Sequence, residues 1–227
     1  ACADEGIQIF GGMGFSEETP MEAAWRDSRI SRIYEGTNEI NKMLSVGMLI
    51  KKAMKGHVDL LGPATAVADE LMGIPSFDTP DYSELFAEEK EMIGKLKKVF
   101  LMVAGAAIQK FGTELDQHQQ LLMAAANILN EVYMAESTIL RAEKNAKRFG
   151  EDTQEGQIAM AKLYLYNAVE IVTQNGKEGI ISFAEGDEQR MMLMGLKRFT
   201  KYTNYPNVIA LRNEIAEKLK AANKYCF

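Results

Sequence analysis

The residues best able to do chemistry lie in the first fifth of the chain, around Glu35. Glu35 stands directly before Gly36 and Thr37, at a break between two helical patterns, where a side chain can project into a cleft. A carboxylate removes a weakly acidic proton only where an apolar, water-poor site raises its basicity. Ile33 and Tyr34 are compatible with such a site. A solvated side chain near a helix start is the competing interpretation, and it fits most glutamates.

A glycine-rich stretch, from Gly11 to Gly14, precedes Glu35 and follows Gln8 closely. Repeated glycine is costly inside a helix and tolerates the backbone of a turn, so the stretch is expected to end a helix over residues 3–10. A glycine also lets the backbone approach a ligand without a Cβ in the way. A plain helix-ending turn is the competing interpretation, and both can hold at once.

Three charged residues on the next predicted helix, Arg26, Asp27 and Arg29, allow two interpretations. Arginine suits phosphate binding because its guanidinium is planar and always charged. A carboxylate between two arginines more often forms a structural charge-assisted network, and we favour that interpretation here.

Two helical patterns would position the candidate base. Thr19 is suited to cap a helix that begins at Pro20, where the missing N–H costs nothing. The pattern is interrupted at Gly36. A further helix is predicted from Asn38 to about Lys55, because apolar residues recur there at helical spacing.

Glycine and proline concentrate between Gly56 and Pro80, which predicts a connector with one short helix near residues 64–71. We therefore predict three segments: the end of a helical domain over residues 1–56, the connector over residues 57–80, and a helical bundle over residues 81–227.

Beyond the connector, apolar stripes at helical spacing predict four or five long helices. Their predicted limits are Asp81 or Ser83 to Gly112, about residue 121 to Gly150, about residue 158 to a break at Gly176 and Gly179, Asp187 to about Tyr202, and Pro206 onward. No convincing run of alternating apolar and polar residues is present. The chain is thus predicted to be all-α, ending in an antiparallel helical bundle.

Composition excludes several classes of function. A net charge of −6 and a pI of about 5.2 disfavour a nucleic-acid surface, because phosphate binding needs a concentrated basic face. No apolar run approaches the ~18 to 20 residues of a membrane-spanning helix. Cys2 and Cys226 form neither a disulfide framework nor a zinc motif, and His57 and His118 stand alone, so no metal site is predicted. This cysteine usage fits a reducing, intracellular setting.

A Met-rich stretch, Met191 to Met194, shares its predicted helix with basic residues. Such a helix could contact a membrane surface or a partner. Core packing with lysines that extend their charged ends to water is the alternative, and we favour it.

Three blocks, in order, carry a family resemblance: QIFGGMGF from Gln8, WRDSRI from Trp25 and IYEGTNEI from Ile33. The set resembles the C-terminal signature of acyl-CoA dehydrogenases: Gln–x–x–Gly–Gly–x–Gly, then Arg–Asp–x–Arg–Ile, then Tyr–Glu–Gly–Thr–x–Glu–Ile. The match covers about residues 3–44. The helical remainder resembles the extension of the very-long-chain subgroup in length and helicity, without a shared motif.

The resemblance implies an FAD-dependent enzyme that converts acyl-CoA thioesters to trans-2-enoyl-CoA in fatty-acid β-oxidation. Glu35 would abstract the α proton of the acyl-CoA while the β hydrogen passes as hydride to flavin N5. Gly36 would lie against the substrate. Thr37 and Glu39 would contact the adenosine part of FAD.

Two further positions, Gln8 and Gly12, match residues of the family that contact the FAD of the neighbouring subunit. The resemblance therefore implies a homo-oligomer, with a dimer favoured. Its other partners would be acyl-CoA and an electron-transfer flavoprotein or similar acceptor. The location would be cytoplasmic in a bacterium, and the mitochondrial matrix or inner membrane in a eukaryote, and the protein would not be secreted.

The sequence opens inside a helical pattern without an initiating Met, so we interpret it as a piece of a longer protein. The N-terminal helical region and the β-domain of the family are not present in it. Preorganised geometry is what such chemistry depends on, so the chain alone is expected to have negligible activity and to bind FAD weakly or not at all.

Two other functions are compatible with this sequence. The segment from Pro80 onward could be an oligomerisation or partner-docking module, since it has long amphipathic stripes and no cluster of catalytic residue types. An acyl-CoA oxidase is the other, because it shares the base and the flavin but lets oxygen reoxidise the cofactor.

Overall fold

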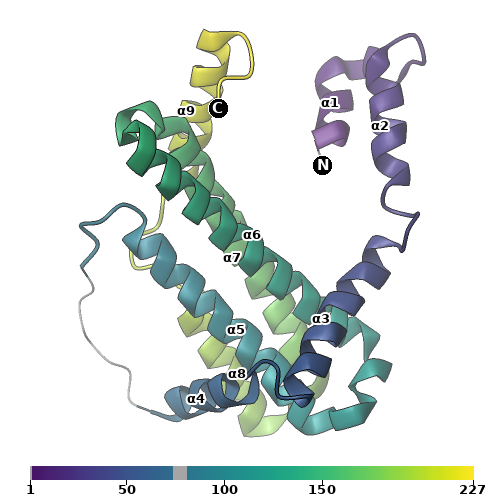
Figure 1. Cartoon of the computed structure of the whole chain (residues 1–227), viewed down its shortest axis with the longest axis vertical. Coiled ribbons are helices and arrows are strands. Elements are labelled where there is room, and N and C mark those ends of the chain that lie inside the picture. Colours follow the sequence, from purple (N-terminus) through teal and green to yellow (C-terminus); the bar gives the residue numbers. More distant parts are fainter. Residues whose placement is uncertain (1, 74–80) are drawn as a thin grey trace. The chain divides into compact units, whose positions relative to one another are not determined.

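The computed structural model describes residues 2–73 and 81–227, and all the regular structure in these ranges is helical (Figure 1). The chain divides into two compact units, Ala1–Ser45 and Val46–Phe227. The prediction of an all-α chain is confirmed.

The first unit contains α1 (Cys2–Phe10), the 3₁₀ helix η1 (Gly11–Phe15), α2 (Pro20–Ile30) and the start of α3 (Asn38–Met54). The second unit contains the rest of α3 and the elements that follow it. These are α4 (Leu61–Met72), α5 (Ala87–Phe111), η2 (Gly112–Gln117), α6 (Gln119–Phe149), η3 (Glu151–Thr153), α7 (Glu155–Phe183), α8 (Gly186–Phe199) and α9 (Val208–Ala222).

Helix α2 begins as predicted, with Pro20 in its first turn. The role predicted for Thr19 is wrong in one respect, because its hydroxyl does not cap the helix. Instead Thr19 Oγ1 donates to the carbonyl of Met13 at 2.6 Å, which ties the start of α2 to η1. The packing of η1 on α1 requires a glycine at position 14, since a Cβ there would lie 2.7 Å from the carbonyl oxygen of Ile7.

The hydrophobic core of the protein lies in the second unit. Helix α6 packs along α7, α5 packs on both, α8 packs on α5 and α7, α4 packs on α5, and α9 packs on α7. Each of the central helices contributes a stripe of fully or almost fully buried residues at helical spacing. Among these residues are Met92, Leu96, Val99 and Val103 of α5, Ile128, Ala135 and Ile139 of α6, Leu165, Val172 and Ile180 of α7, and Met192, Leu196 and Phe199 of α8.

The prediction that Gly176 and Gly179 break a helix is wrong. Helix α7 continues through both and ends at Phe183. A Cβ at Gly176 would lie 2.8 Å from Cδ1 of Leu196 on α8, and a Cβ at Gly179 would lie 3.0 Å from a methyl group of Val103 on α5. The two glycines therefore allow three helices to pack closely, and this packing outweighs their low helix propensity.

The start predicted for α5, at Asp81 or Ser83, is also wrong. Asp81 accepts a hydrogen bond from the backbone N–H of Ser83 at 2.9 Å, which forms a local turn instead of a cap. The helix begins at Ala87, after Phe86, whose backbone is left-handed with φ of 63°. Because the side chain of Phe86 is almost completely buried, its burial fixes where the helix starts.

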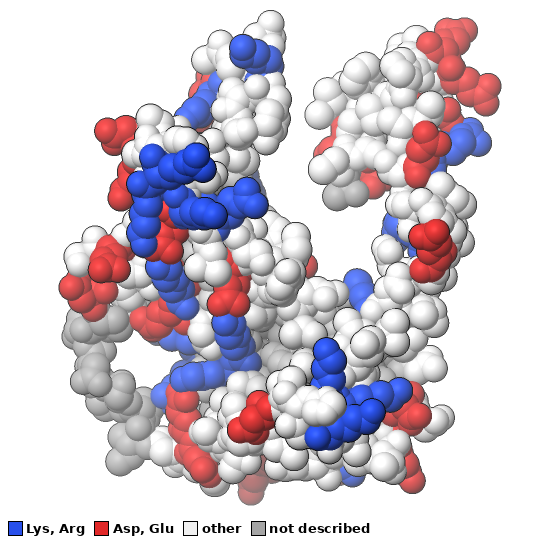
Figure 2. Space-filling model, viewed as in Figure 1, with Lys and Arg blue, Asp and Glu red and all other residues white. Residues whose placement is uncertain are grey.

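Ion pairs cross the outer faces of these helices. Lys90 of α5 and Lys147 of α6 both contact Glu143 of α6 at 2.7 Å. Basic and acidic side chains alternate over α5 and α6 on the face seen in Figure 2.

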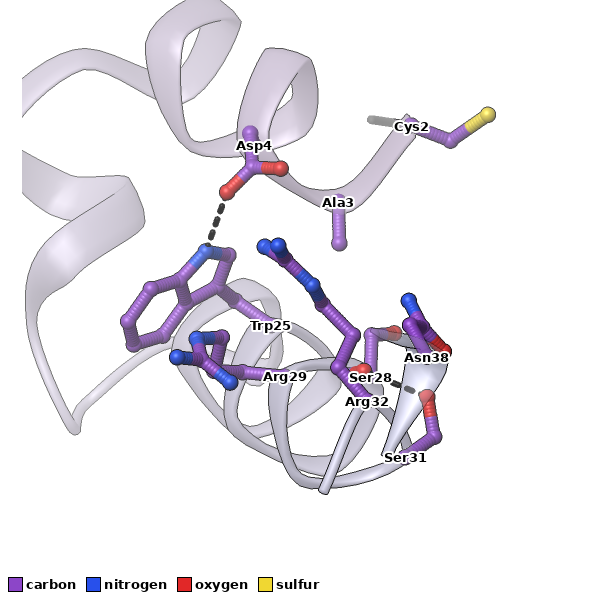
Figure 3. Close-up of a pocket in the computed structure, with 9 residues that line it drawn as sticks. All are labelled: Cys2, Ala3, Asp4, Trp25, Ser28, Arg29, Ser31, Arg32 and Asn38. Carbon is purple, nitrogen blue, oxygen red and sulfur yellow. Dashed lines mark hydrogen bonds between the residues drawn. The ribbon is translucent and has the colours of Figure 1, made fainter. Parts of the chain in front are cut away.

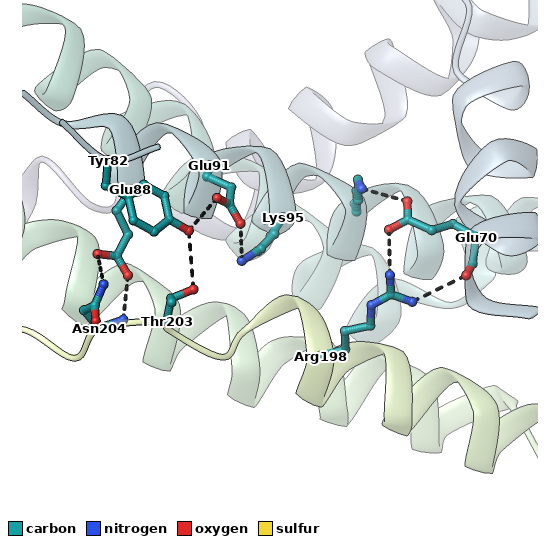
Figure 4. Close-up of polar contacts among 9 residues, drawn as sticks. Glu70, Tyr82, Glu88, Glu91, Lys95, Arg198, Thr203 and Asn204 are labelled. Carbon is teal, nitrogen blue, oxygen red and sulfur yellow. Dashed lines mark hydrogen bonds and ion pairs between the residues drawn. The ribbon is translucent and has the colours of Figure 1, made fainter. Parts of the chain in front are cut away.

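A second set of ion pairs joins α4 to its neighbours. Glu70 of α4 forms an ion pair with Lys98 of α5 at 2.7 Å and another with Arg198 of α8 at 3.4 Å (Figure 4). Near the start of α5, Tyr82 donates to Glu91, and Glu88 accepts from Asn204 (Figure 4).

The Met-rich helix α8 divides its side chains between two environments. Met192 is 3% exposed and lies in the core, as the favoured interpretation predicted, while Met194 is 73% exposed. Within the described residues, no helix combines the length and apolar character that crossing a membrane requires.

Candidate active site

Glu35 lies outside both neighbouring helices, in the turn that joins α2 to α3, as predicted from Gly36. Its backbone is left-handed, with φ of 56°, and Gly36 follows with φ of 87°. A left-handed backbone costs a residue with a side chain about 1–2 kcal/mol, whereas glycine adopts it freely. Strained residues of this kind concentrate at functional sites, where surrounding contacts hold them.

Hydrogen bonds close this turn at its two ends. The backbone N–H of Ile33 donates to the carbonyl of Ile30 at 2.9 Å, which ends α2. The N–H of Asn38 donates to the carbonyl of Arg32 at 3.2 Å, which brings the start of α3 back to the end of α2.

Asn41, in the first turn of α3, reaches the middle of the turn. Its side-chain Nδ2 donates to the carbonyl of Gly36 at 3.0 Å, and its backbone N–H donates to the carbonyl of Thr37 at 2.9 Å. A Cβ at Gly36 would lie 2.8 Å from Oδ1 of Asn41, so the carboxamide and the turn fit closely together. Figure 1 locates this segment between α2 and α3.

Thr37 and Glu39 are brought together at the start of α3. The hydroxyl of Thr37 accepts from the backbone N–H of Ile40 at 3.3 Å, which is the bond of a helix cap. The N–H of Glu39 itself, and then the hydroxyl of Thr37, hold the pKa of the Glu39 carboxyl below its usual range. Glu39 is therefore a carboxylate at the positive end of a helix, where negative charge is favoured.

Gln8 and Gly12 lie on other elements, α1 and η1, and both are exposed. A Cβ at Gly12 would meet nothing within 4 Å, and its backbone is not left-handed. Neither packing nor backbone conformation within this chain requires a glycine at position 12, in contrast to Gly14.

The surroundings of Glu35 in this chain are open. Glu35 is exposed, and Ile33 and Tyr34 beside it are about half exposed. Of residues 2–45, all of which the structure describes, Gly14 alone is buried. A dry environment for Glu35 would thus have to come from protein surface beyond the first unit.

A pocket of about 460 Å³ lies between α1 and α2 in the first unit (Figure 3). Trp25 Nε1 donates to Asp4 across it at 2.6 Å, and this bond, together with the more distant charge of Arg32, holds the pKa of the Asp4 carboxyl below its usual range. Its lining is mostly polar: Cys2, Ala3, Asp4, Trp25, Ser28, Arg29, Ser31, Arg32 and Asn38.

The network predicted for Arg26, Asp27 and Arg29 takes a different form. Arg26 pairs with Glu22, one turn earlier on α2, with Nε donating to Oε1 at 2.8 Å. Arg29 lines the pocket in place of joining that pair. The reason is helical geometry: residues four apart share a face, whereas adjacent residues point apart.

Sequence reasoning missed Asn41 and the bond between Asp4 and Trp25. The role of Asn41 could have been predicted, because a polar residue four positions after Thr37 faces the turn that precedes the helix. The indole N–H of the single tryptophan needs an acceptor, which is a signal for the second. The described residues contain no cluster of three His, Cys, Asp or Glu side chains that could hold a metal ion.

Comparison with known proteins gives matches in both units of the chain. Two family models, each described as the C-terminal domain of acyl-CoA dehydrogenase, match residues 1–48 and 95–198. A probable acyl-CoA dehydrogenase of Bacillus subtilis is 38% identical over 222 residues, which make up 98% of this chain and 37% of that protein. The short-chain acyl-CoA dehydrogenase of Megasphaera elsdenii is 51% identical over 47 residues, 21% of this chain and 12% of that protein.

A solved structure, that of an acyl-CoA dehydrogenase from Bacillus anthracis complexed with FAD, has 39% sequence identity and a TM-score of 0.91. The match covers 99% of this chain and 37% of that one. The chain therefore spans less than two fifths of the length of these relatives. It belongs to the acyl-CoA dehydrogenase family of oxidoreductases and corresponds to the C-terminal part of its members.

Proposed function

We propose that this chain supplies the catalytic base of an FAD-dependent acyl-CoA dehydrogenase that forms trans-2-enoyl-CoA in fatty-acid β-oxidation. The observation that carries the proposal is the backbone of Glu35, which is left-handed and lies in a turn between two helices within the match to residues 1–48. In that position the side chain is free of helical packing and open to a bound substrate.

In this proposal the carboxylate of Glu35 takes the α proton of the acyl-CoA thioester. Gly36 lies against the substrate, where the missing Cβ permits close approach. The exposed apolar side chains of Ile33 and Tyr34 are available to pack against the rest of the enzyme and exclude water, which raises the basicity of a carboxylate.

Four residues would hold FAD: Gln8, Gly12, Thr37 and Glu39. The open surroundings of Gly12 fit this role, because the chain has no need of its own for a glycine there. Glu39, kept ionised by its hydrogen bonds, offers acceptor oxygens to the hydroxyl or amino groups of an adenosine. A bound FAD would supply the acceptor for the β hydrogen, which leaves the substrate as hydride.

The remaining assignments follow from the same family membership. The partners would be acyl-CoA, an electron-transfer flavoprotein or similar acceptor, and a second copy of the protein in a dimer. We place the protein in the bacterial cytoplasm or, in a eukaryote, in the mitochondrial matrix or at its inner membrane. We retain the division into residues 1–56, 57–80 and 81–227. A helical docking module without enzyme activity is not favoured, because residues 1–48 and residues 95–198 both match acyl-CoA dehydrogenase domains.

The test is Glu35→Gln in the full-length flavoprotein that carries this chain. We expect the rate of flavin reduction by acyl-CoA, followed as the loss of flavin absorbance in stopped flow, to fall by about 10²–10⁴-fold, the usual contribution of a general base. Glu17→Gln, another exposed glutamate of the first unit, is the matched control and should leave the rate unchanged. Flavin reduction within a few fold of the unaltered enzyme in Glu35→Gln would refute the proposal.

A further inference from the structure

The turn that carries Glu35 has no regular structure of its own to hold its backbone. Residues 31–37 lie between the hydrogen-bond ladders of α2 and α3. The bonds that close the turn attach at Ile33 and Arg32 on one side and at Asn38 on the other. The two left-handed residues, Glu35 and Gly36, lie between these attachments.

We infer that Asn41 is a positioning residue for the proposed base, and that its side-chain amide fixes the left-handed backbone at Glu35 by holding the carbonyl of Gly36. The bond that carries this inference joins Asn41 Nδ2 to the Gly36 oxygen at 3.0 Å. The inference rests on the proposed function, since it gives a reason for the bond only if Glu35 acts on a substrate.

The backbone of glycine is freer than that of any other residue. Gly36 can adopt many backbone conformations at little cost, so by itself it would let the preceding residue relax out of the left-handed region. A bond to the Gly36 carbonyl fixes the peptide plane that follows it. The free energy of one such bond is similar in size to the strain at Glu35, so the bond decides whether the strained conformation persists.

The placement of Asn41 makes this restraint rigid. Its own backbone N–H donates to the carbonyl of Thr37, so it belongs to the first turn of α3. That helix is 17 residues long and its start is capped by Thr37. The carboxamide therefore anchors the turn to the helix. Its Oδ1 lies close to Gly36, which leaves little room for another arrangement.

The test uses the full-length flavoprotein with Asn41→Leu, which keeps the shape of the side chain and removes the amide. We expect the rate of flavin reduction to fall by about 10–100-fold, because a displacement of about 1 Å costs up to that much. Substrate affinity and FAD content should stay near those of the unaltered enzyme. The kinetic isotope effect with acyl-CoA deuterated at the α carbon should rise, since a misplaced base slows the removal of that proton and leaves other steps unchanged.

Two further variants separate the position of Glu35 from the stability of α3. Asn41→Gln retains the amide donor and should recover part of the lost rate. Ser45→Ala removes the hydrogen bond from Ser45 Oγ to the Lys42 carbonyl one turn later in α3, and should leave the rate and the isotope effect unchanged. If Asn41→Leu fails to bind FAD, Asn41→Asp, which replaces the donor by an acceptor of the same size, takes its place.

The outcomes distinguish this inference from the proposed function. If Glu35→Gln abolishes flavin reduction while the Asn41 variants keep the rate within about twofold and the isotope effect unchanged, the positioning role is overturned and the proposed base stands. An equal loss in Ser45→Ala also overturns it, because the effect would then belong to α3 as a whole. If Glu35→Gln retains activity, the proposed function and the positioning role fail together.

Discussion

At the scale of single residues, Glu143 illustrates how this protein holds a largely buried carboxylate. Its side chain is 11% exposed and contacts Lys90 and Lys147, both at 2.7 Å. The hydrogen bonds from Lys147 and then from Lys90 hold the pKa of the Glu143 carboxyl below its ordinary value of 4.5. The carboxylate therefore contributes stability at neutral pH that disappears when it is protonated.

Glu143→Gln should lower the free energy of unfolding by about 1–2 kcal/mol near neutral pH, because the charge-assisted bonds are lost. A lowered native pKa means that this contribution is complete above about pH 4.5 and declines as the pH falls through the native pKa. The free energies of unfolding of the unaltered chain and of the variant should therefore become equal in acid. Urea denaturation across this range measures the difference.

The control is Glu136→Gln, which removes a more exposed partner of Lys97 on the same two helices. Solvent screens that pair, so its loss should have a smaller effect. The free energies of unfolding of the unaltered chain and of Glu143→Gln could instead differ by the same amount in acid and at neutral pH. That result would contradict the role assigned to the carboxylate.

At the scale of elements, helix α5 contains two glycines in opposite environments. A Cβ at Gly105 would lie 2.6 Å from Cβ of Ala64 on α4, and Ala64 has no flexible end that could move aside. A Cβ at Gly94 would meet nothing within 4 Å. The first glycine is needed for α4 to pack on α5, and the second is not.

Gly105→Ala should lower the free energy of unfolding by about 1–3 kcal/mol, since it forces two helices apart. Gly94→Ala should raise it by about 0.5–1 kcal/mol, because alanine favours the helix and has room. Urea denaturation of the two variants tests whether their free energies of unfolding change in opposite directions. A stability gain in both would mean that α4 is not fixed against α5 at Ala64.

Helix α8 offers a second matched pair. Met192→Ala should cost about 2–5 kcal/mol, because it leaves a cavity in the core. Met194→Ala should change stability by less than about 0.5 kcal/mol, because that side chain is already exposed. Thermal or urea denaturation compares them, and equal effects would show that the two sides of α8 are not packed differently.

At the scale of the whole molecule, the two units differ in how much apolar surface they bury. The second has a continuous core, whereas Gly14 is the one buried residue among residues 2–45. Large apolar side chains such as Ile9 and Phe15 are exposed in the first unit. Exposed apolar surface of this extent is typical of a face that other protein surface covers.

Amide hydrogen exchange of the 227-residue chain should therefore be fast in α1 and α2 and slow in α5, α6 and α7, because local opening costs little where few apolar contacts must break. Mass spectrometry of peptides from the two units provides the measurement. In the full-length flavoprotein α1 and α2 should become protected. Equal protection in the isolated chain would contradict the assignment of the core to the second unit.

The success of sequence-based prediction in this protein depended on how local the signal was. Pro20 correctly predicted the start of α2, and Gly150 correctly predicted the end of α6. Both predictions depend only on which backbone conformations proline and glycine allow within a few residues. Gly36 marked the turn at Glu35 for the same reason. The helix break predicted at Gly176 and Gly179 was wrong, because the role of these glycines depends on side chains of α5 and α8 that are distant in sequence.

The amino-acid sequence by itself determined the helical class, most of the helix ends, the family and the place of Glu35 in a break between helices. These features depend on periodicity, capping and short motifs, all of which act over a few turns of chain. Only the tertiary structure decided that α5 begins after Phe86, that Gly105 and Gly176 serve close packing, and that Asn41 bonds to Gly36. Each of those outcomes depends on which surfaces meet in the folded chain, and contact between distant segments is set by packing of the whole core.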